Sequence, residues 1–449
     1  MSKMKNSGLN WIGNIPDEWN ISTMKYDCTK ITDYTASGSF ASLAENVEYL
    51  DSPDYAMLVR VADLSNRRDI PPIYINEHSY NFLRNSNLKG GELILSNIGS
   101  VGDVFFYEPL YKKSSLAPNA ILAISKYLTK YLYYYFLCPT VSNELKEIGG
   151  NAVQSKFNKT QLRAFKCLQP KRQEQKLIAD FLNEKIDIID GIICDLNNQI
   201  EILCKYKKQL ISEAVTKGLN KKVSIKDSGI EWIGSIPEHW DIKLIKNICS
   251  LKGRIGWEGL TKDEYISEGP ILITGINFDN GSIDWNSCEH VSEWRYNQAK
   301  SIQIKNKDLL ITKDGTVGKV AIVKDCPEKV TLNSGVLLLR PLNNEYIEKY
   351  LYYVLLSNEF WHWFEIENIG NTTIIHLYQN RFAKFKLALP PIDEQKEIVN
   401  YLDIKCSEIE EILNSKIKQK EQMEQYKKSV IYEYVTGKKR VEGAEELYG

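Results

Sequence analysis

The run QEQKLIADFLNEKIDIIDGIICDLNNQIEILCKYKKQLISEAVT, residues 173–216, decides the architecture of this chain. Its apolar side chains recur at alternating spacings of three and four residues, the heptad pattern of a helix with one apolar edge. The seam residues are Leu182, Ile186, Ile189, Ile193, Leu196, Ile200 and Leu203. A helix of this length would span roughly 65 Å. Because its apolar edge is unfavourable in water, we expect a second helix to cover it.

Residues 393–436 supply that second helix, because they repeat the first. "PKRQEQKLIADFL" from Pro170 corresponds to "PPIDEQKEIVNYL" from Pro390, and "YKKQLISEAVTKG" from Tyr206 to "YKKSVIYEYVTGK" from Tyr426. The second seam contains Leu402, Ile409, Leu413 and Met423, and we expect Cys406, Lys416 and Lys420 to interrupt it.

The regions before the two helices are also duplicated. The pattern K-x-S-G-x-x-W-I-G-x-I-P-x-x-W runs from Lys5 to Trp19 and again from Lys226 to Trp240. We interpret it as a structural clasp with buried indoles, the alternative being a direct ligand role. Strands are expected in "YAMLVRVADL" from Tyr55, "GELILSNIG" from Gly91 and "AILAIS" from Ala120, and a helix in "KYLYYYFLC" from Lys130.

These features predict an α+β chain with an internal pseudo-twofold duplication. The expected regions are a first domain at 1–169, a long helix at 170–221, a second domain at 222–389, and a long helix with a loose acidic tail at 390–449. A length of 449 residues fits two or three domains. The net charge of −1 does not indicate a basic nucleic-acid binder, so any DNA-binding face must be a local patch.

The nine cysteines show no paired C-x-x-C, which favours reduced thiols in a cytoplasmic protein over a disulfide framework or a metal site. We interpret Cys194 and Cys204 as packing residues of the first long helix. The chain shows no signal peptide, and no apolar run is long enough to span a membrane.

The sequence contains none of the common catalytic motifs. A Walker A loop, H-E-x-x-H and G-x-S-x-G are absent, and the histidines have no metal-ligand spacing. The string DIPPIY from Asp69 only approximates the D/N-P-P-Y/F loop of amino-methyltransferases, and we interpret it as a turn. No set of carboxylates and a lysine stands out as the centre of a metal-dependent nuclease, although the signature of such a centre is weak. We therefore expect no catalytic residue, metal or cofactor in this chain.

Two glycine turns are the candidate DNA contacts. Gly99-Ser100-Val101-Gly102 and Gly315-Thr316-Val317-Gly318 each follow an apolar strand, and glycines let a backbone approach a phosphate closely. The alternative, which the sequence alone favours, is a tight β-turn that joins two strands. The predicted DNA-binding residues are Ser96, Asn97, Gly99, Ser100, Gly102, Lys112, Lys113, Asn119, Lys313, Asp314, Gly315, Thr316, Gly318, Lys319, Asn333 and Ser334.

Together, the doubled opening box, the glycine turns and "LPPIDEQKEIVNYL" with its helix resemble the specificity subunits of Type I restriction-modification systems. The resemblance implies that two target domains read the halves of a split asymmetric site in double-stranded DNA. It implies that antiparallel helices set the spacing and dock two modification subunits along the seam residues. S-adenosylmethionine, ATP and Mg²⁺ would then be on the modification and restriction/translocase subunits. The alternatives are a self-sufficient methyltransferase or nuclease, and a coiled-coil scaffold without a nucleic-acid role.

Overall fold

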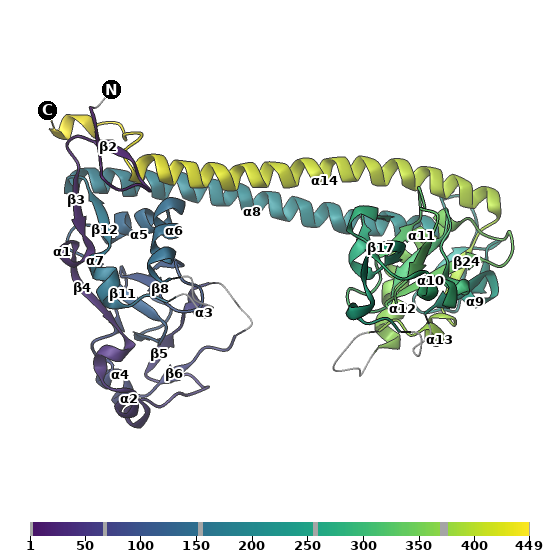
Figure 1. Cartoon of the computed structure of the whole chain (residues 1–449), viewed down its shortest axis with the longest axis horizontal. Coiled ribbons are helices and arrows are strands. Elements are labelled where there is room, and N and C mark those ends of the chain that lie inside the picture. Colours follow the sequence, from purple (N-terminus) through teal and green to yellow (C-terminus); the bar gives the residue numbers. More distant parts are fainter. Residues whose placement is uncertain (1–2, 66–69, 151–155, 255–258, 369–375, 449) are drawn as a thin grey trace. The chain divides into compact units, whose positions relative to one another are not determined.

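The computed structural model describes residues 3–65, 70–150, 156–254, 259–368 and 376–448 (Figure 1). The chain forms two compact units: unit 1 contains residues 1–196 and 418–449, and unit 2 contains residues 197–417. Each unit combines a domain of strands and short helices with parts of both long helices, which confirms the predicted fold class. The division falls inside both helices, and the predicted region boundaries stay a prediction.

The domain of unit 1 is built on two four-stranded sheets. The antiparallel one has the order β4-β11-β8-β9, with β4 at Cys28–Asp33, β11 at Ala120–Ser125, β8 at Leu93–Ser96 and β9 at Val104–Phe106. The mixed one has the order β6-β5-β10-β7, with β6 at Tyr74–Ile75, β5 at Ala56–Val59, β10 at Ser114–Leu116 and β7 at Asn87–Leu88. Strands β5 and β10 are parallel, so their carboxyl ends meet at one edge.

Unit 2 repeats this plan. Its antiparallel sheet has the order β16-β24-β21-β22, with β16 at Cys249–Gly253, β24 at Val336–Pro341, β21 at Leu309–Thr312 and β22 at Val320–Ile322. The second sheet is β20 (Glu289–His290), β17 (Ile266–Ile273) and β23 (Val330–Leu332), with β17 and β23 parallel. The duplication read in the sequence therefore extends to sheet topology.

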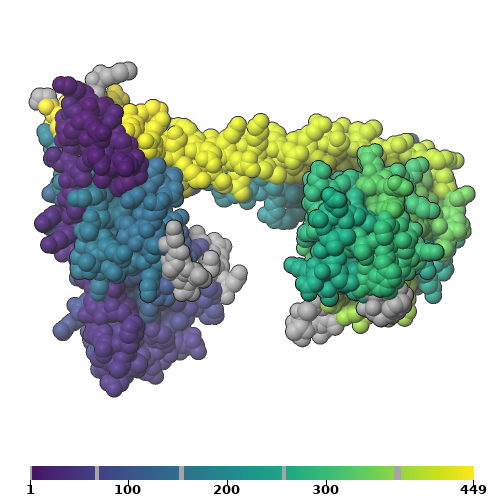
Figure 2. All heavy atoms as spheres, viewed as in Figure 1, coloured from purple at the N-terminus to yellow at the C-terminus, as the bar shows by residue number. Residues whose placement is uncertain are grey.

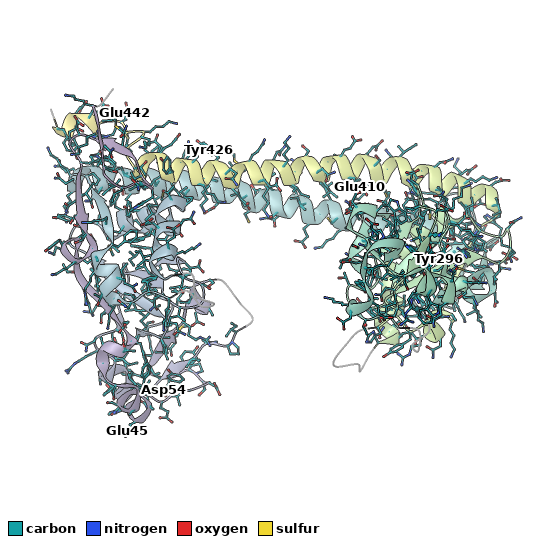
Figure 3. The ribbon with its side chains drawn as sticks, viewed as in Figure 1. Glu45, Asp54, Tyr296, Glu410, Tyr426 and Glu442 are labelled. Atoms are coloured by element: carbon teal, nitrogen blue, oxygen red, sulfur yellow. The ribbon has the colours of Figure 1, made fainter. Side chains whose placement is uncertain are left out.

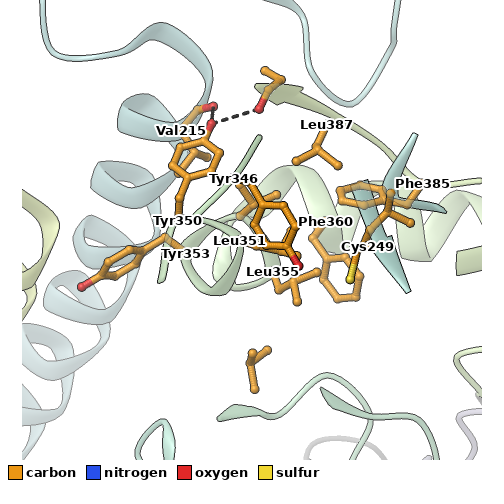
Figure 4. Close-up of a cluster of buried hydrophobic side chains, with 14 of the residues drawn as sticks. Val215, Cys249, Tyr346, Tyr350, Leu351, Tyr353, Leu355, Phe360, Phe385 and Leu387 are labelled. Carbon is orange, nitrogen blue, oxygen red and sulfur yellow. Dashed lines mark hydrogen bonds between the residues drawn. The ribbon is translucent and has the colours of Figure 1, made fainter. Parts of the chain in front are cut away.

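Short helices cover the antiparallel sheets and anchor them to the long helices. They are α5 (Thr129–Leu137) and α6 (Pro139–Ile148) in unit 1, and α11 (Glu348–Leu356) and α12 (Asn358–Glu367) in unit 2. In the core of unit 2, the Tyr350 hydroxyl is close to the carbonyl oxygens of Val215 and Ala388, at 3.1 and 3.0 Å (Figure 4). This fully buried tyrosine thus ties α11 to the end of a long helix.

Not every element predicted in the domain of unit 1 has the predicted extent. The helix expected from Lys130 is confirmed as α5, and the strand expected from Ala120 is confirmed as β11. The strand expected at 55–64 ends at Val59, and Val61–Leu64 is the short helix α3. The prediction failed there because Arg60 and Asp63 form a capping box, which starts a helical turn within an apolar run.

The long helices are α8 (Arg172–Lys217) and α14 (Ile392–Val435), within one or two residues of the predicted ends. They pair antiparallel inside each unit. In unit 1 the Lys427 ammonium lies 2.6 Å from the Asp190 carboxylate, and in unit 2 the Lys207 ammonium lies 2.5 Å from Glu410. Lys207, a charged residue on the seam side, is therefore neutralised across the helix pair.

Each opening box is a clasp, as predicted. In unit 1 the buried Trp19 indole donates a hydrogen bond to Glu174 at the start of α8, at 2.8 Å. In unit 2 the Trp240 indole donates to Glu394 at the start of α14, at 2.9 Å. Glycines close the other side, because a Cβ at Gly437 or Gly218 would lie 2.4 Å from Pro16 or 3.1 Å from Trp240. Each box thus joins the start of one long helix to the end of the other.

The tail after Arg440 is ordered, which corrects the expectation of a loose end. Within unit 1 it lies beside the N-terminal residues (Figure 2). The Tyr448 hydroxyl donates to Glu174 at 2.7 Å and accepts the Lys171 backbone N–H at 2.8 Å, while Ala444 is fully buried. An acidic composition concealed these contacts, because they are made by a few individual side chains and not by a repeated pattern.

Candidate nucleic-acid interface

In unit 1, three segments converge at the edge where the parallel strands β5 and β10 end. Arg60 leaves β5, and Ala117 leaves β10 while its N–H donates to the carbonyl oxygen of Val59 at 2.8 Å. The turn between β8 and β9 joins them, because the Asn97 N–H donates to the carbonyl oxygen of Asn119 at 3.2 Å. The fold therefore brings loops from both sheets to one place.

A cavity of about 400 Å³ opens between these segments in unit 1. Its lining includes Tyr49, Arg60, Gly99, Ser100 and Asn119. Asn119 adopts the left-handed conformation (φ 71°) and Gly99 likewise (φ 82°), which turns the chain sharply at the mouth of the cavity. The concave, polar-edged site is of the kind that can accept part of a nucleotide.

The Arg60 side chain is held rigidly at this cavity. Its Nε and Nη2 atoms donate to the two Asp63 carboxylate oxygens at 3.0 and 2.7 Å, and Nη2 also donates to the Pro71 carbonyl at 2.7 Å. The hydrogen bonds to Asp63 raise the pKa of the Arg60 guanidinium, which is charged in any case. Sequence reasoning missed Arg60; the signal was a charged residue placed directly after four apolar ones.

The same edge of unit 2 has the same construction from other residues. Thr274 leaves β17, Asn333 leaves β23, and the Lys313 N–H donates to the Gly335 carbonyl at 2.8 Å. Thr274 caps its turn with Asn277, at the position where unit 1 has Arg60 and Asp63. Beside them His376 Nδ1 lies 2.5 Å from the Asp314 carboxylate, where unit 1 has a backbone bridge between Ile98 and Lys156.

The structure groups many of the predicted DNA-binding residues at these two edges. Those that lie together are Asn97, Gly99, Ser100 and Asn119 in unit 1, and Lys313, Asp314, Gly315, Thr316, Asn333 and Ser334 in unit 2. The tips of both turns are exposed, at Gly99, Ser100, Gly315 and Thr316. That these residues touch DNA stays a prediction.

Other predicted residues lie elsewhere. Lys112 and Lys113 precede β10, whereas the cavity lies after its end, and Lys113 packs on the Tyr55 ring at 3.8 Å. Lys319 lines a separate cavity of unit 2 with Lys207 and Glu410.

Three more serve packing or internal bonding. Ser96 is fully buried and donates to the carbonyl of Ile98. A Cβ at Gly102 would lie 2.7 Å from Lys146, and one at Gly318 would lie 2.4 Å from Trp361. The second glycine of each turn thus lies at a packed position with a positive φ, 92° at Gly102 and 84° at Gly318, while the first is at the exposed tip.

The predicted seam lies between the long helices. Its buried members are Leu182, Ile186, Ile189, Leu196, Leu402 and Ile409, and its half-buried members are Ile193, Ile200, Leu203, Leu413 and Met423. Cys406 was expected to interrupt the seam, but it is buried within it, because a thiol packs like a small apolar group. Lys416 and Lys420 are half-buried.

Apolar side chains also remain on the outer faces of both helices. They are Ile188, Ile192, Ile202 and Tyr206 on α8, and Ile404, Ile412, Ile417 and Tyr426 on α14 (Figure 3 labels Tyr426). Cys194 and Cys204 are exposed as well, so they are not the packing residues that we expected. These faces are candidates for docking other subunits.

Within the described ranges, no three His, Cys, Asp or Glu side chains form a metal-binding group. No helix in those ranges is both long and apolar enough to cross a membrane. The string that approximates a methyltransferase loop begins at Asp69, outside the described residues; its Pro71 carbonyl accepts the hydrogen bond from Arg60.

Comparison with known proteins gives a consistent result. The family model of the Type I restriction modification DNA specificity domain matches residues 30–202 and 237–419. The putative type I restriction enzyme MjaX specificity subunit of Methanocaldococcus jannaschii is 28% identical over 443 residues, covering 96% of each chain. The MjaVIII specificity subunit of the same organism is 28% identical over 276 residues, covering 61% of each chain.

The fold is also found among solved structures. One of them comes from a study of complex assembly and conformational transition of the type I R-M system, and its TM-score is 0.68 at 12% identity. The match covers 94% of this chain and 99% of the other.

Proposed function

This chain belongs to the family of Type I restriction-modification DNA specificity subunits, and from that premise we propose how its two units share the reading of DNA. A member of this family recognises DNA and is not itself the enzyme. We assign one half of a split, asymmetric site in double-stranded DNA to each unit. The reading edge is where the parallel strands end, β5 and β10 in unit 1 and β17 and β23 in unit 2.

The observation that carries this assignment is the contrast between two equivalent edges. Unit 1 has the charged pair Arg60–Asp63 where unit 2 has the neutral pair Thr274–Asn277. Base edges are distinguished by their pattern of donors and acceptors, so different side chains in the same position select different bases. The duplicated fold supplies the position, and the diverged side chains supply two different half-sites.

We further propose that the outer faces of α8 and α14 dock two modification subunits, with restriction/translocase subunits joining the assembly. The exposed apolar side chains on both helices support this, since a row of apolar groups on a surface helix is typical of an interaction site. S-adenosylmethionine, ATP and Mg²⁺ would then be bound by those partners. We place the complex in the cytoplasm, as the unpatterned cysteines indicate.

A domain exchange tests the division of labour. Residues 28–165 of unit 1 would be replaced by the corresponding segment of another specificity subunit, and the methylated bases of a host that also expresses the modification subunit would be mapped. We expect one half of the methylated motif to change and the other half to persist. A motif that changes in both halves, or in neither, would refute the assignment. The host with the modification subunit alone is the control.

A further inference from the structure

Arg60 is the cationic side chain on the cavity of unit 1, among lining residues that are otherwise uncharged. It lies at the carboxyl end of β5, and its side chain retains 24% of its exposure. Its partner Asp63 retains only 7%. The partly exposed guanidinium is thus held against a nearly buried carboxylate. Because the side chain is already ordered, it would lose little conformational entropy on binding DNA.

The hydrogen-bond donors of Arg60 can be counted. A guanidinium has five N–H donors. Three are used, because Nε and Nη2 bond both oxygens of Asp63 and Nη2 also bonds the Pro71 carbonyl. Within the described residues no hydrogen bond involves Nη1, so its two N–H groups remain available to a ligand. A single nitrogen with two hydrogens can serve two neighbouring acceptors.

We propose that Arg60, fixed by Asp63, reads a guanine in the half-site of unit 1. Guanine presents two adjacent acceptors, N7 and O6, in the major groove, whereas adenine, thymine and cytosine each present a different pattern there. The fixed Nη1 atom selects that acceptor pair. This proposal rests on the assignment of one half-site to each unit.

The second unit supports the specificity of this role. At the same place in the fold it has Thr274, whose hydroxyl lies 2.8 Å from the Asn277 amide oxygen, so no cation stands at that position. Thr274 and Asn277 show that a neutral pair is sufficient to close the turn after the strand. The charge in unit 1 therefore requires an explanation beyond the capping of α3.

The experiment couples a protein variant to a base analogue. The full complex of this chain with its modification subunit would be titrated with duplexes that carry 7-deazaguanine, which lacks the N7 acceptor, at each guanine of the methylated motif in turn. We expect the wild-type complex to lose about tenfold in affinity at one position. The affinity of the Arg60→Ala complex should not change when 7-deazaguanine replaces guanine at that position. At every guanine of the other half-site this variant should respond like the wild type.

Further variants sharpen the result. Asp63→Asn should reduce discrimination at the same base pair by releasing the guanidinium, and Arg60→Lys should do so although the charge is retained. Arg84→Ala removes an exposed arginine outside the cavity and should respond like the wild type. The unchanged response of the other half-site shows that the variant complex is folded.

Two outcomes would overturn the proposal. Equal weakening of all sequences by Arg60→Ala, with a shallower salt dependence, would mean a phosphate contact. Full retention of discrimination would mean a structural ion pair. A wild-type complex that prefers no sequence would instead refute the assignment of half-sites on which the proposal rests.

Discussion

At the residue scale, Glu174 is the most consequential side chain outside the interface. It is fully buried, and it receives hydrogen bonds from Trp19 and Tyr448 and an ion pair from Arg440 at 2.6 Å. Burial raises the pKa of the Glu174 carboxyl above its usual range, and the three partners only partly offset this. The folded chain therefore binds this proton more tightly than the unfolded chain does.

The raised pKa of Glu174 determines how its contribution to stability changes with pH. Stabilisation by Glu174 is complete below the ordinary carboxyl pKa and is lost as pH rises through the pKa of the folded chain. Glu174→Gln cannot ionise, so we expect the stability difference, wild type minus variant, to fall as pH rises above the ordinary carboxyl pKa of about 4. Thermal unfolding at a series of pH values measures this difference. A difference that grows with pH would show that the Arg440 ion pair dominates.

The cysteines give a second residue-scale prediction. Burial, followed by the nearby charge of Asp27, raises the pKa of the Cys28 thiol to about 12, and burial raises that of Cys249 to about 12. The thiolate is the reactive form, so both should resist iodoacetamide at pH 8, whereas exposed Cys204 should be alkylated first. Mass spectrometry of the modified peptides checks this, with the urea-unfolded chain as control. Early labelling of Cys28 would contradict the burial of this thiol.

The candidate site could be predicted only in part at this scale. The turn tips at Ser100 and Thr316 were found because glycines mark turns in any sequence. Arg60 was missed because its apolar run was expected to remain a strand as far as Leu64, although its partner Asp63 is only three residues away. His376 was missed because the pair that positions it joins residues whose proximity depends on the fold. Asp314 and His376 are 62 residues apart, and no local pattern encodes that distance.

At the element scale, the helix pair offers a matched test in two consecutive isoleucines of α8. Ile189 is 2% exposed on the seam, and Ile188 is 53% exposed on the outer face. Ile189→Asp should destabilise unit 1 by several kcal/mol, because a carboxylate would be buried without a partner. Ile188→Asp should change stability by less than about 0.5 kcal/mol. Denaturant unfolding of the isolated chain compares them, and equal losses would mean that the seam is misplaced.

The long helices were predictable from sequence for a physical reason. A seam repeated over many turns is a periodic signal, so isolated exceptions such as Lys207 did not conceal it. Short elements lack that redundancy. The helix α3 has only four residues and depends on a single capping box, and the tail depends on a few individual contacts, such as those of Arg440 and Tyr448 with Glu174.

At the scale of the whole molecule, the two units are built alike but differ in how far the glutamate of the opening-box clasp is covered. In each, an opening-box tryptophan bonds a glutamate at the start of a long helix, Trp19 with Glu174 and Trp240 with Glu394. The Glu394 side chain keeps 37% exposure and contacts His239, whereas Glu174 is covered by the C-terminal tail. The tail is therefore an addition to unit 1 that unit 2 does without.

Removing residues 438–449 should consequently act on one unit only. The deletion takes away Arg440 and Tyr448, and it leaves the Glu174 carboxylate with the Trp19 indole as its remaining partner among those described. Loss of the cation from a buried pair costs about 3–5 kcal/mol, which in a domain of this size lowers the melting temperature by on the order of 10 °C. We expect calorimetry to show one transition moving down and the transition of unit 2 unmoved.

Two controls separate the tail's contribution from a general effect. Tyr448→Phe removes one hydroxyl and should give a small part of the shift in the same transition. Glu174→Gln in the truncated chain should recover much of the loss, because an amide is less costly to bury than an unpaired carboxylate. If both transitions moved together, the two units would unfold as one cooperative body, and the tail would stabilise the whole chain through the helices that the units share.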